Sequence, residues 1–137
     1  LIPKNSIITP HPKEFSRLFG ESKDSFERLE LAKSKAKELN IYIVLKGHHT
    51  QIITPEGNVF YNITGNSGLA KGGSGDVLLG IITSFIAQSY SPENAAIFGV
   101  WLHGKAADFT AEKYSKEAML ASDVIQYIGE VFKYLQK

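Results

Sequence analysis

A run of five consecutive apolar residues at 41–45 constrains the fold more than any other feature of this 137-residue sequence. It is β-rich and lacks the alternation of a strand with one wet face, so it predicts an interior strand covered on both sides. Residues 24–39 repeat apolar side chains at helical spacing opposite a lysine-rich face. Residues 6–9, ended by a proline, predict an earlier strand tip. A strand, a helix and a strand of this kind predict a right-handed parallel βαβ unit.

After this unit the pattern changes to a hairpin and then to helices. Residues 51–54 and 58–62 are short β-rich runs around a Pro-Glu-Gly turn, which is typical of a hairpin. Helical segments follow at about 75–90, 92–114 and 122–136, and the first of them is apolar nearly all round, which predicts a buried helix. The whole pattern predicts a single α/β domain, with parallel strands early and helices late.

Charge and composition exclude several classes of partner and site. With 15 Lys+Arg against 14 Asp+Glu, nothing indicates a nucleic-acid or membrane-surface partner. No segment approaches the roughly 18 apolar residues of a membrane helix, and no signal-peptide pattern is present. The lack of cysteine excludes disulfides and thiolate metal sites, and it fits a cytoplasmic protein. Since the adjacent His48 and His49 are expected to diverge, no metal site is predicted.

Residues 65–76 hold five of the twelve glycines and run directly into the first late helix. Glycines leave backbone N–H groups bare at the positive end of the helix dipole, so residues 72–75 (Gly-Gly-Ser-Gly) predict an anion site. No Gly-Lys-Ser/Thr triplet follows at Walker A spacing, and the third glycine of a dinucleotide fingerprint would fall at Leu78. A tight turn without a ligand is the structural alternative.

Asp76 is a carboxylate at the very start of that helix and would lie beside any anion that the loop binds. The helix dipole favours its ionised form, which is able to take a proton from a hydroxyl aligned with a phosphoryl group. A base next to a phosphate cradle is expected of a phosphoryl-transfer enzyme. The alternative is a helix-start charge that adds about 0.3–1 kcal/mol of stability and has no catalytic part.

Two further candidate contacts follow the ends of predicted strands. Residues 46–50 (Lys-Gly-His-His-Thr) leave the interior strand, at the sheet edge where open α/β sheets bind ligands. Lys46 would contact a phosphate and Thr50 a sugar or base, although a polar surface turn explains the segment equally well. His11 lies in a rigid turn between two prolines, where it either orients a substrate or is a surface imidazole.

Five segments together resemble the ADP/ATP-dependent NAD(P)H-hydrate dehydratases, a family of carbohydrate-kinase-like repair domains in the ribokinase-like superfamily. They are Thr-Pro-His-Pro-Lys-Glu-Phe at 9–15, Val-Leu-Lys-Gly at 44–47 with its continuation to Thr50, residues 66–78, Leu-His-Gly at 102–104, and Ala-Ser-Asp at 121–123. They occur in the family's order and span nearly the whole chain. The resemblance implies a three-layer α/β/α ribokinase-like fold. Residues 1–137 would be its C-terminal half, with parallel strands plus a β-hairpin followed by a helical cluster.

The resemblance also implies a hydro-lyase that repairs nicotinamide coenzymes. ADP or ATP, with Mg²⁺, would be consumed to dehydrate hydrated NADH or NADPH, through phosphorylation of the ring hydroxyl and loss of phosphate. The family further implies a homo-oligomer, typically a tetramer, and a preceding half-domain that supplies more coenzyme contacts. Lys13 stands where many members have a small residue, and we expect little effect from it.

Carried over by position, the family's roles fall on residues already singled out. Asp76 would be the catalytic base and a contact to the hydrated coenzyme, and His11 a second coenzyme contact. The nucleotide-binding residues would be Lys46, Gly47, His48, His49, Thr50 and Gly75, and the anion hole Gly72, Gly73, Ser74 and Gly75. Two other functions remain open. One is an ATP-dependent kinase of a small alcohol (a sugar or vitamin precursor) with the same fold, and the other is a non-catalytic nucleotide-binding subunit.

Overall fold

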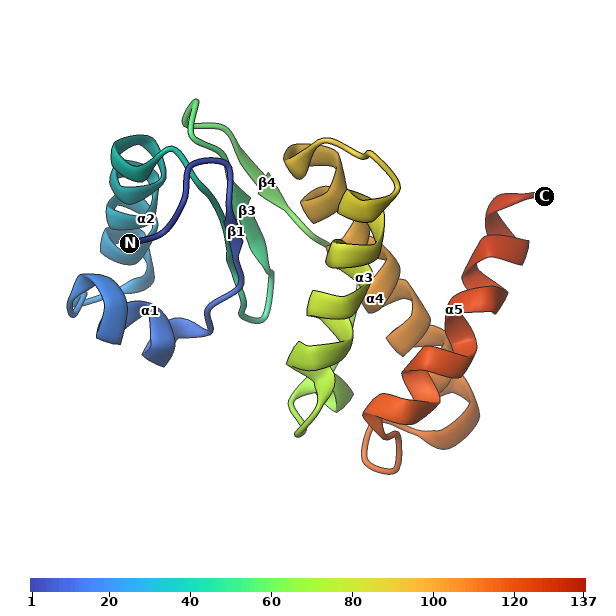
Figure 1. Cartoon of the computed structure of the whole chain (residues 1–137). Coiled ribbons are helices and arrows are strands. Elements are labelled where there is room, and N and C mark those ends of the chain that lie inside the picture. The colour runs from blue at the N-terminus through green and yellow to red at the C-terminus, as the bar shows by residue number, and fades with distance from the viewer. The chain divides into compact units, whose positions relative to one another are not determined.

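The computed structural model describes all 137 residues, which divide into two compact units (Figure 1). Unit 1 consists of Leu1–Asn62 and Ser91–Ile97, and unit 2 consists of Ile63–Tyr90 and Phe98–Lys137. Each unit is described by itself. None of the helices in either unit is both long and apolar enough to cross a lipid bilayer.

The strands of unit 1 form one mixed sheet. In spatial order they are β1 (Ile7–Ile8), β2 (Tyr42–Leu45), β3 (Gln51–Ile53) and β4 (Val59–Tyr61). β1 and β2 are parallel, whereas β2–β3 and β3–β4 are antiparallel. The predicted parallel strand–helix–strand unit and the predicted hairpin are therefore both confirmed, and the interior strand is the point where the sheet changes from parallel to antiparallel.

Two helices cover one face of this sheet, namely α1 (Pro12–Phe19) and α2 (Ser25–Leu39). Their apolar side chains and those of the strands share one buried cluster: Phe15, Ala32, Ala36, Ile41, Ile43, Leu45 and Ile53. Val44 and its cross-strand partner Ile52 point to the opposite face and are also buried. Because both faces of β2 exclude water, the uniformly apolar sequence of this strand is explained.

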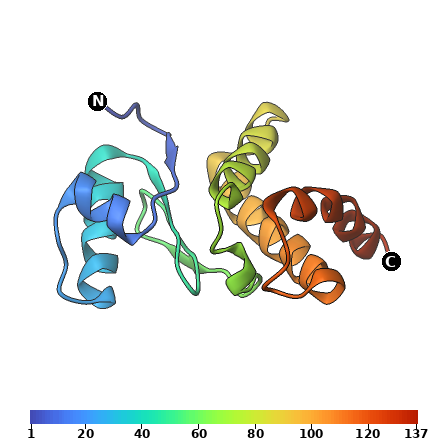
Figure 2. The same ribbon diagram turned by 90° about the horizontal axis from the view of Figure 1, so that it is seen from below.

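Unit 2 is helical. It contains the short 3₁₀ helix η1 (Ser67–Leu69), α3 (Ser74–Ala87), most of α4 (Pro92–Tyr114) and α5 (Ala121–Leu135). The three long helices gather in one cluster in both views (Figures 1 and 2). An aromatic group lies among them, with the rings of Phe85, Trp101 and Phe132 each 4.8–6.4 Å from the ring of Phe98. Gly99 lets α3 approach α4 closely, because a Cβ there would lie 2.7 Å from Cγ1 of Ile82.

The prediction that α3 is buried all round is wrong. Leu78, Ile82 and Phe85 face the helix cluster and are buried, whereas Leu79 and Ile86 are 48% and 41% exposed. The helical neighbours of α3 within unit 2 cover one side only, so an almost uniformly apolar helix presents a second apolar face. The sequence showed correctly that α3 is apolar on nearly all sides. It could not show how much of that apolar surface the neighbouring helices of unit 2 cover.

Candidate active-site segments

The glycine loop of unit 2 ends at the N-terminus of α3, as predicted. Gly73 is the N-cap, with φ of +91°, and no side chain caps the helix. Around it, the Ser74 N–H donates to the Lys71 carbonyl at 3.3 Å and the Val77 N–H to the Gly73 carbonyl at 3.1 Å. The N–H groups of Gly75 and Asp76 therefore remain for a ligand at the positive end of the helix dipole. The Asp76 side chain is exposed in this first turn.

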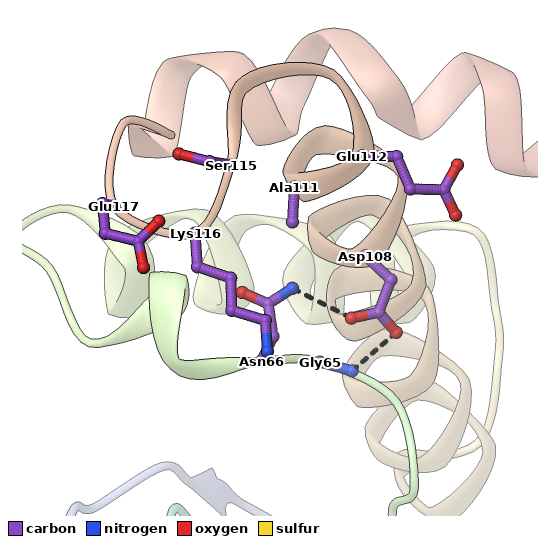
Figure 3. Close-up of a pocket in the computed structure, with 8 residues that line it drawn as sticks. All are labelled: Gly65, Asn66, Asp108, Ala111, Glu112, Ser115, Lys116 and Glu117. Atoms are coloured by element: carbon purple, nitrogen blue, oxygen red, sulfur yellow. Dashed lines mark hydrogen bonds between the residues drawn. The ribbon is translucent and has the colours of Figure 1, made fainter.

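The entry of the loop is held by Asp108 of α4. Its Oδ2 accepts the Gly65 N–H at 3.0 Å, and its Oδ1 accepts the Asn66 side-chain amide at 2.9 Å (Figure 3). Oδ1 of Asn66 in turn accepts the Gly68 N–H at 2.9 Å and so caps η1. Asp108 was absent from the sequence predictions. The signal that points to it is its spacing of four residues from Gly104, which puts both on one face of α4.

Gly104 is required by the same close approach. A Cβ at this position would lie 2.7 Å from the carbonyl carbon of Thr64 and 2.9 Å from the Gly65 nitrogen. The Thr64 hydroxyl also donates to the Trp101 carbonyl at 2.9 Å. The backbone of residues 64–65 therefore lies directly against α4. This close approach explains why the Leu-His-Gly segment at 102–104 ends in glycine.

The middle of the loop is tied to the connection between α4 and α5. Nζ of Lys71 donates to the carbonyl oxygens of Glu117 and Met119, both at 2.6 Å. Gly68 packs against the same connection, since a Cβ there would lie 2.8 Å from Cγ of Met119. Lys71 was also missed by sequence reasoning, because nothing in a single sequence indicates that a lysine will bind backbone carbonyls 46 and 48 residues away.

An open pocket of about 530 Å³ lies beside the entry of the loop (Figure 3). Its lining residues are Gly65, Asn66, Asp108, Ala111, Glu112, Ser115, Lys116 and Glu117. A hydrogen bond from its own backbone, and then one from Ser115, hold the pKa of the Glu117 carboxyl below its ordinary value. The pocket carries charges of both signs, and the Asp108 carboxylate is turned towards the loop within it.

In unit 1 the structure brings together the two segments predicted at strand ends. β1 and β2 are parallel, so their carboxyl ends lie at the same edge of the sheet. There the Lys46 N–H donates to the Pro10 carbonyl at 3.0 Å, which joins the end of β2 directly to the turn before His11. The backbone hydrogen bond from His11 and, to a smaller extent, the Lys46 charge lower the pKa of the α1 residue Glu14 at this edge.

His11 is the N-cap of α1. Its Nδ1 accepts the Glu14 N–H at 3.2 Å, and the Glu14 carboxylate accepts the His11 N–H at 3.0 Å, which completes a capping box. Pro12 opens the helix and Phe15 anchors it in the core. The backbone hydrogen bond from His11 is the main reason why the pKa of Glu14 lies below its ordinary value of 4.5. The imidazole remains 47% exposed at the sheet edge.

Residues 46–50 form the connection between β2 and β3. Lys46 and Thr50 are half-buried, and Gly47, His48 and His49 are exposed. The two imidazole rings meet edge-to-face with centroids 4.4 Å apart, so the expectation that they diverge is wrong. That expectation rested only on their being adjacent in sequence, and in this turn adjacent side chains lie side by side. The Thr50 carbonyl accepts the Asn62 N–H at 2.9 Å, which fixes the far end of the segment.

Comparison with known proteins gives concordant results. A family model described as NAD(P)H-hydrate dehydratase matches residues 2–130. The bifunctional NAD(P)H-hydrate repair enzyme Nnr of Moorella thermoacetica is 41% identical over 133 residues, which are 96% of this chain and 25% of that protein. The ADP/ATP-dependent NAD(P)H-hydrate dehydratase of Bacillus subtilis, co-crystallized with ATP/Mg²⁺, superposes with a TM-score of 0.88 at 38% identity, covering 95% of this chain and 49% of that one.

The fold class is confirmed by a further structure. A ribokinase-like superfamily protein from Enterococcus faecalis matches with a TM-score of 0.79 at 34% identity, over 96% of this chain and 45% of that protein. The sheet and helices described above therefore belong to the ribokinase-like α/β fold. The chain spans between a quarter and a half of the length of these relatives.

Proposed function

Because this chain belongs to the NAD(P)H-hydrate dehydratase family, we propose that the protein containing it restores NADH and NADPH from their hydrates, using ADP or ATP. The observation that supports this most directly is the glycine loop. It enters α3 without a side-chain cap and leaves two backbone N–H groups beside the exposed Asp76. That is a place for a phosphoryl group next to a base, which is what phosphorylation of a ring hydroxyl requires.

The reaction assigned to these residues has two steps. Asp76 takes the proton of the ring hydroxyl, the hydroxyl oxygen bonds to the terminal phosphorus, and the bond from phosphorus to the nucleotide breaks. The ring carbon then loses phosphate, and loss of a proton from the neighbouring carbon restores the double bond. Gly72, Gly73, Ser74 and Gly75 are proposed as the anion hole for the transferring group, in which the Gly75 N–H is open and the Ser74 N–H must first leave the Lys71 carbonyl.

The remaining roles fall on the sheet edge of unit 1. We assign nucleotide contacts to residues 46–50, together with Gly75, and a coenzyme contact to His11. The shared position of His11 and Lys46 at the carboxyl ends of two parallel strands supports this assignment, since ligands of open α/β sheets bind at that edge. The capping-box geometry leaves half of the imidazole surface available for a contact.

Magnesium fits this scheme as a companion of the nucleotide. The chain gathers no group of three or more His, Asp or Glu side chains that could hold a metal. In phosphoryl-transfer sites, Mg²⁺ is held mainly by the phosphates, with one or two carboxylates. No residue of this chain is assigned as a Mg²⁺ ligand, because Asp76 is needed as the base; held by the phosphates, the ion would neutralise their charge.

We further propose that residues 1–137 are the C-terminal portion of a single ribokinase-like domain and that the protein is a cytoplasmic homo-oligomer, a tetramer. Coverage of only 49% of the Bacillus subtilis structure supports the first statement. The large apolar side chains that remain exposed support association with further protein surface. Light scattering of the full-length protein tests the assembly, and a monomeric mass would contradict it.

The decisive experiment compares wild-type and Asp76→Asn full-length protein. Each is given hydrated NADH with ADP, and then with ATP, and recovery of NADH absorbance is followed. We expect the variant to keep nucleotide binding while kcat falls by about 10²–10⁴-fold, the usual contribution of a general base. Glu93→Gln is the matched control, because Glu93 is also a first-turn carboxylate, on α4, and lies outside every proposed role.

Each other outcome identifies an alternative. If neither substitution changes kcat, Asp76 is only a helix-start charge. No recovery of NADH by wild-type protein, together with ATP-dependent phosphorylation of a small alcohol, identifies a kinase of the same fold. Nucleotide binding without turnover of any substrate identifies a non-catalytic subunit.

A further inference from the structure

Asp108 is outside all the roles assigned above, yet its carboxylate holds the entry of the glycine loop through Gly65 and Asn66. We propose that Asp108 is a positioning residue that sets the geometry of the loop and, through the loop, of Asp76. This inference rests on the proposed function for the importance of Asp76. The contacts between Asp108 and the loop are independent of that function.

With asparagine at position 66, the contacts require a carboxylate at position 108. Both oxygens face donors, one the Gly65 N–H and the other the Asn66 side-chain amide, at 3.0 and 2.9 Å. An ionised carboxylate is acceptor-only and satisfies both donors (Figure 3). An asparagine at the same place would turn its own NH₂ group against one of them, because an amide offers a single acceptor atom.

From this anchor, hydrogen bonds continue along the loop towards α3. Asn66 caps η1 through the Gly68 N–H, and its carbonyl accepts the Leu69 N–H at 3.1 Å. Lys71 follows directly after η1 and its cap, and is fixed to two carbonyls of the α4–α5 connection. Its own carbonyl accepts the Ser74 N–H, the first residue of α3. Displacement of Asn66 therefore reaches the first turn of α3 through bonded neighbours.

The entry has little room to adjust. Gly65 adopts φ of +100°, a conformation that L side chains rarely adopt, and a Cβ on Gly104 would lie 2.7 Å from the Thr64 carbonyl carbon and 2.9 Å from the Gly65 nitrogen. Gly104 itself contacts the backbone of Thr64 and Gly65. The loop entry meets one face of α4 both through backbone contact at Gly104 and through hydrogen bonds to Asp108. We therefore expect loss of the Asp108 contacts to move the loop and not only to loosen a side chain.

The proposal is tested by exchanging the two side chains. In Asp108→Asn, one donor of the loop loses its acceptor. In Asn66→Asp, two carboxylates face each other. In the double variant, which combines Asn66→Asp with Asp108→Asn, the new amide on α4 can accept the Gly65 N–H through its oxygen. Its NH₂ group can donate to the new carboxylate at position 66, and that carboxylate can still accept the Gly68 N–H. All three hydrogen bonds are restored with unchanged net charge.

We expect kcat for NADH recovery by the full-length protein to fall about 10- to 100-fold in each single variant, the size of effect that slight misplacement of a catalytic group produces. The double variant should recover most of this loss. Glu112→Gln is the matched control, since it removes a carboxylate one turn further along α4 that lines the same pocket, and we expect unchanged kcat. Thermal unfolding of each variant shows what fraction is folded during the assay.

Unchanged kcat in Asp108→Asn overturns the proposal. So does a double variant that regains its thermal stability but not its kcat, because Asp108 would then act through its charge and not through position. A loss of activity that only follows the folded fraction assigns a purely structural role and overturns it as well. If wild-type protein recovers no NADH, the proposed function fails, and the inference is decided by amide hydrogen exchange. Exchange across residues 65–76 must then rise in Asp108→Asn and return to normal in the double variant.

Discussion

Individual glycines of this chain have different structural roles. Gly104 is needed because backbone occupies the space of its side chain, and Gly73 because the loop reaches α3 in a left-handed conformation. Gly129, on α5, has nothing within 4 Å of a Cβ position. Composition cannot separate these cases, because a glycine that permits contact and one that merely leaves a gap are identical in sequence.

Gly104→Ala should destabilise the protein by about 1–3 kcal/mol, since its Cβ meets backbone atoms that cannot rotate away. Gly129→Ala is the matched control and should stabilise it by about 0.5–1 kcal/mol through improved helix propensity. The free energy of unfolding of the full-length protein, measured in urea, checks both. Equal effects at the two positions would contradict the close approach of residues 64–65 to α4.

At the scale of elements, local signals predicted the chain well. The start of α1 is also set by signals close together in sequence, with His11 as cap, Pro12 at the first position and Glu14 completing the box, although the capping role of His11 was not predicted. Ser91-Pro92 likewise opens α4, and the Ser91 hydroxyl accepts the Asn94 N–H at 3.2 Å. These features were predictable because they lie within three or four residues of one another, which is the range over which sequence patterns carry direct physical meaning.

The contacts that hold the glycine loop were not predictable in this way. Asp108 and Gly65 are 43 residues apart, and Lys71 and Met119 are 48 residues apart. Helical periodicity places Asp108 on a face of α4 but does not say which loop will meet that face. The candidate residues of the loop were therefore found from sequence, whereas the residues that hold it were found only from the fold.

The α1 cap predicts a dependence of stability on pH. Because the folded-state pKa of Glu14 lies below 4.5, its contribution is complete above the pKa of the unfolded chain and is lost as pH falls through the lower folded value. Glu14→Gln keeps a capping side chain but cannot ionise. The Tm difference between wild type and this variant should be largest near neutrality and shrink in acid. A difference that stays constant from neutral to acid pH would contradict the role of the Glu14 charge.

For the whole molecule, the two units differ in what stabilises them. Unit 1 is built on a sheet with both faces of β2 covered, and unit 2 on packed helices, and both units leave some large apolar side chains exposed. In unit 2 most of these lie on the long helices. The exposed group on its long helices includes Leu79, Ile86, Ile125, Phe132 and Leu135. Large apolar side chains exposed along one group of helices are typical of surfaces that pack against further protein.

Residues 1–137 expressed alone should therefore bind a hydrophobic dye and show no recovery of NADH from its hydrate. The full-length protein should bind much less dye per chain and be active. Dye fluorescence and NADH absorbance on the two preparations, at equal molar concentration, make the comparison. Activity of the shorter chain at the rate of the full-length protein would contradict the assignment of residues 1–137 as a portion of one domain.

The bond from Lys71 to the α4–α5 connection has a practical consequence for protein engineering. Because Nζ binds backbone oxygens, the connection must keep its length and path, whereas the exposed side chain at position 117 is not required for the bond. Residues 1–137 contain no cysteine, so Glu117→Cys adds one labelling position within this portion of the protein, next to the glycine loop. A fluorophore attached there would report on movement of the loop during turnover while leaving the lysine bond intact.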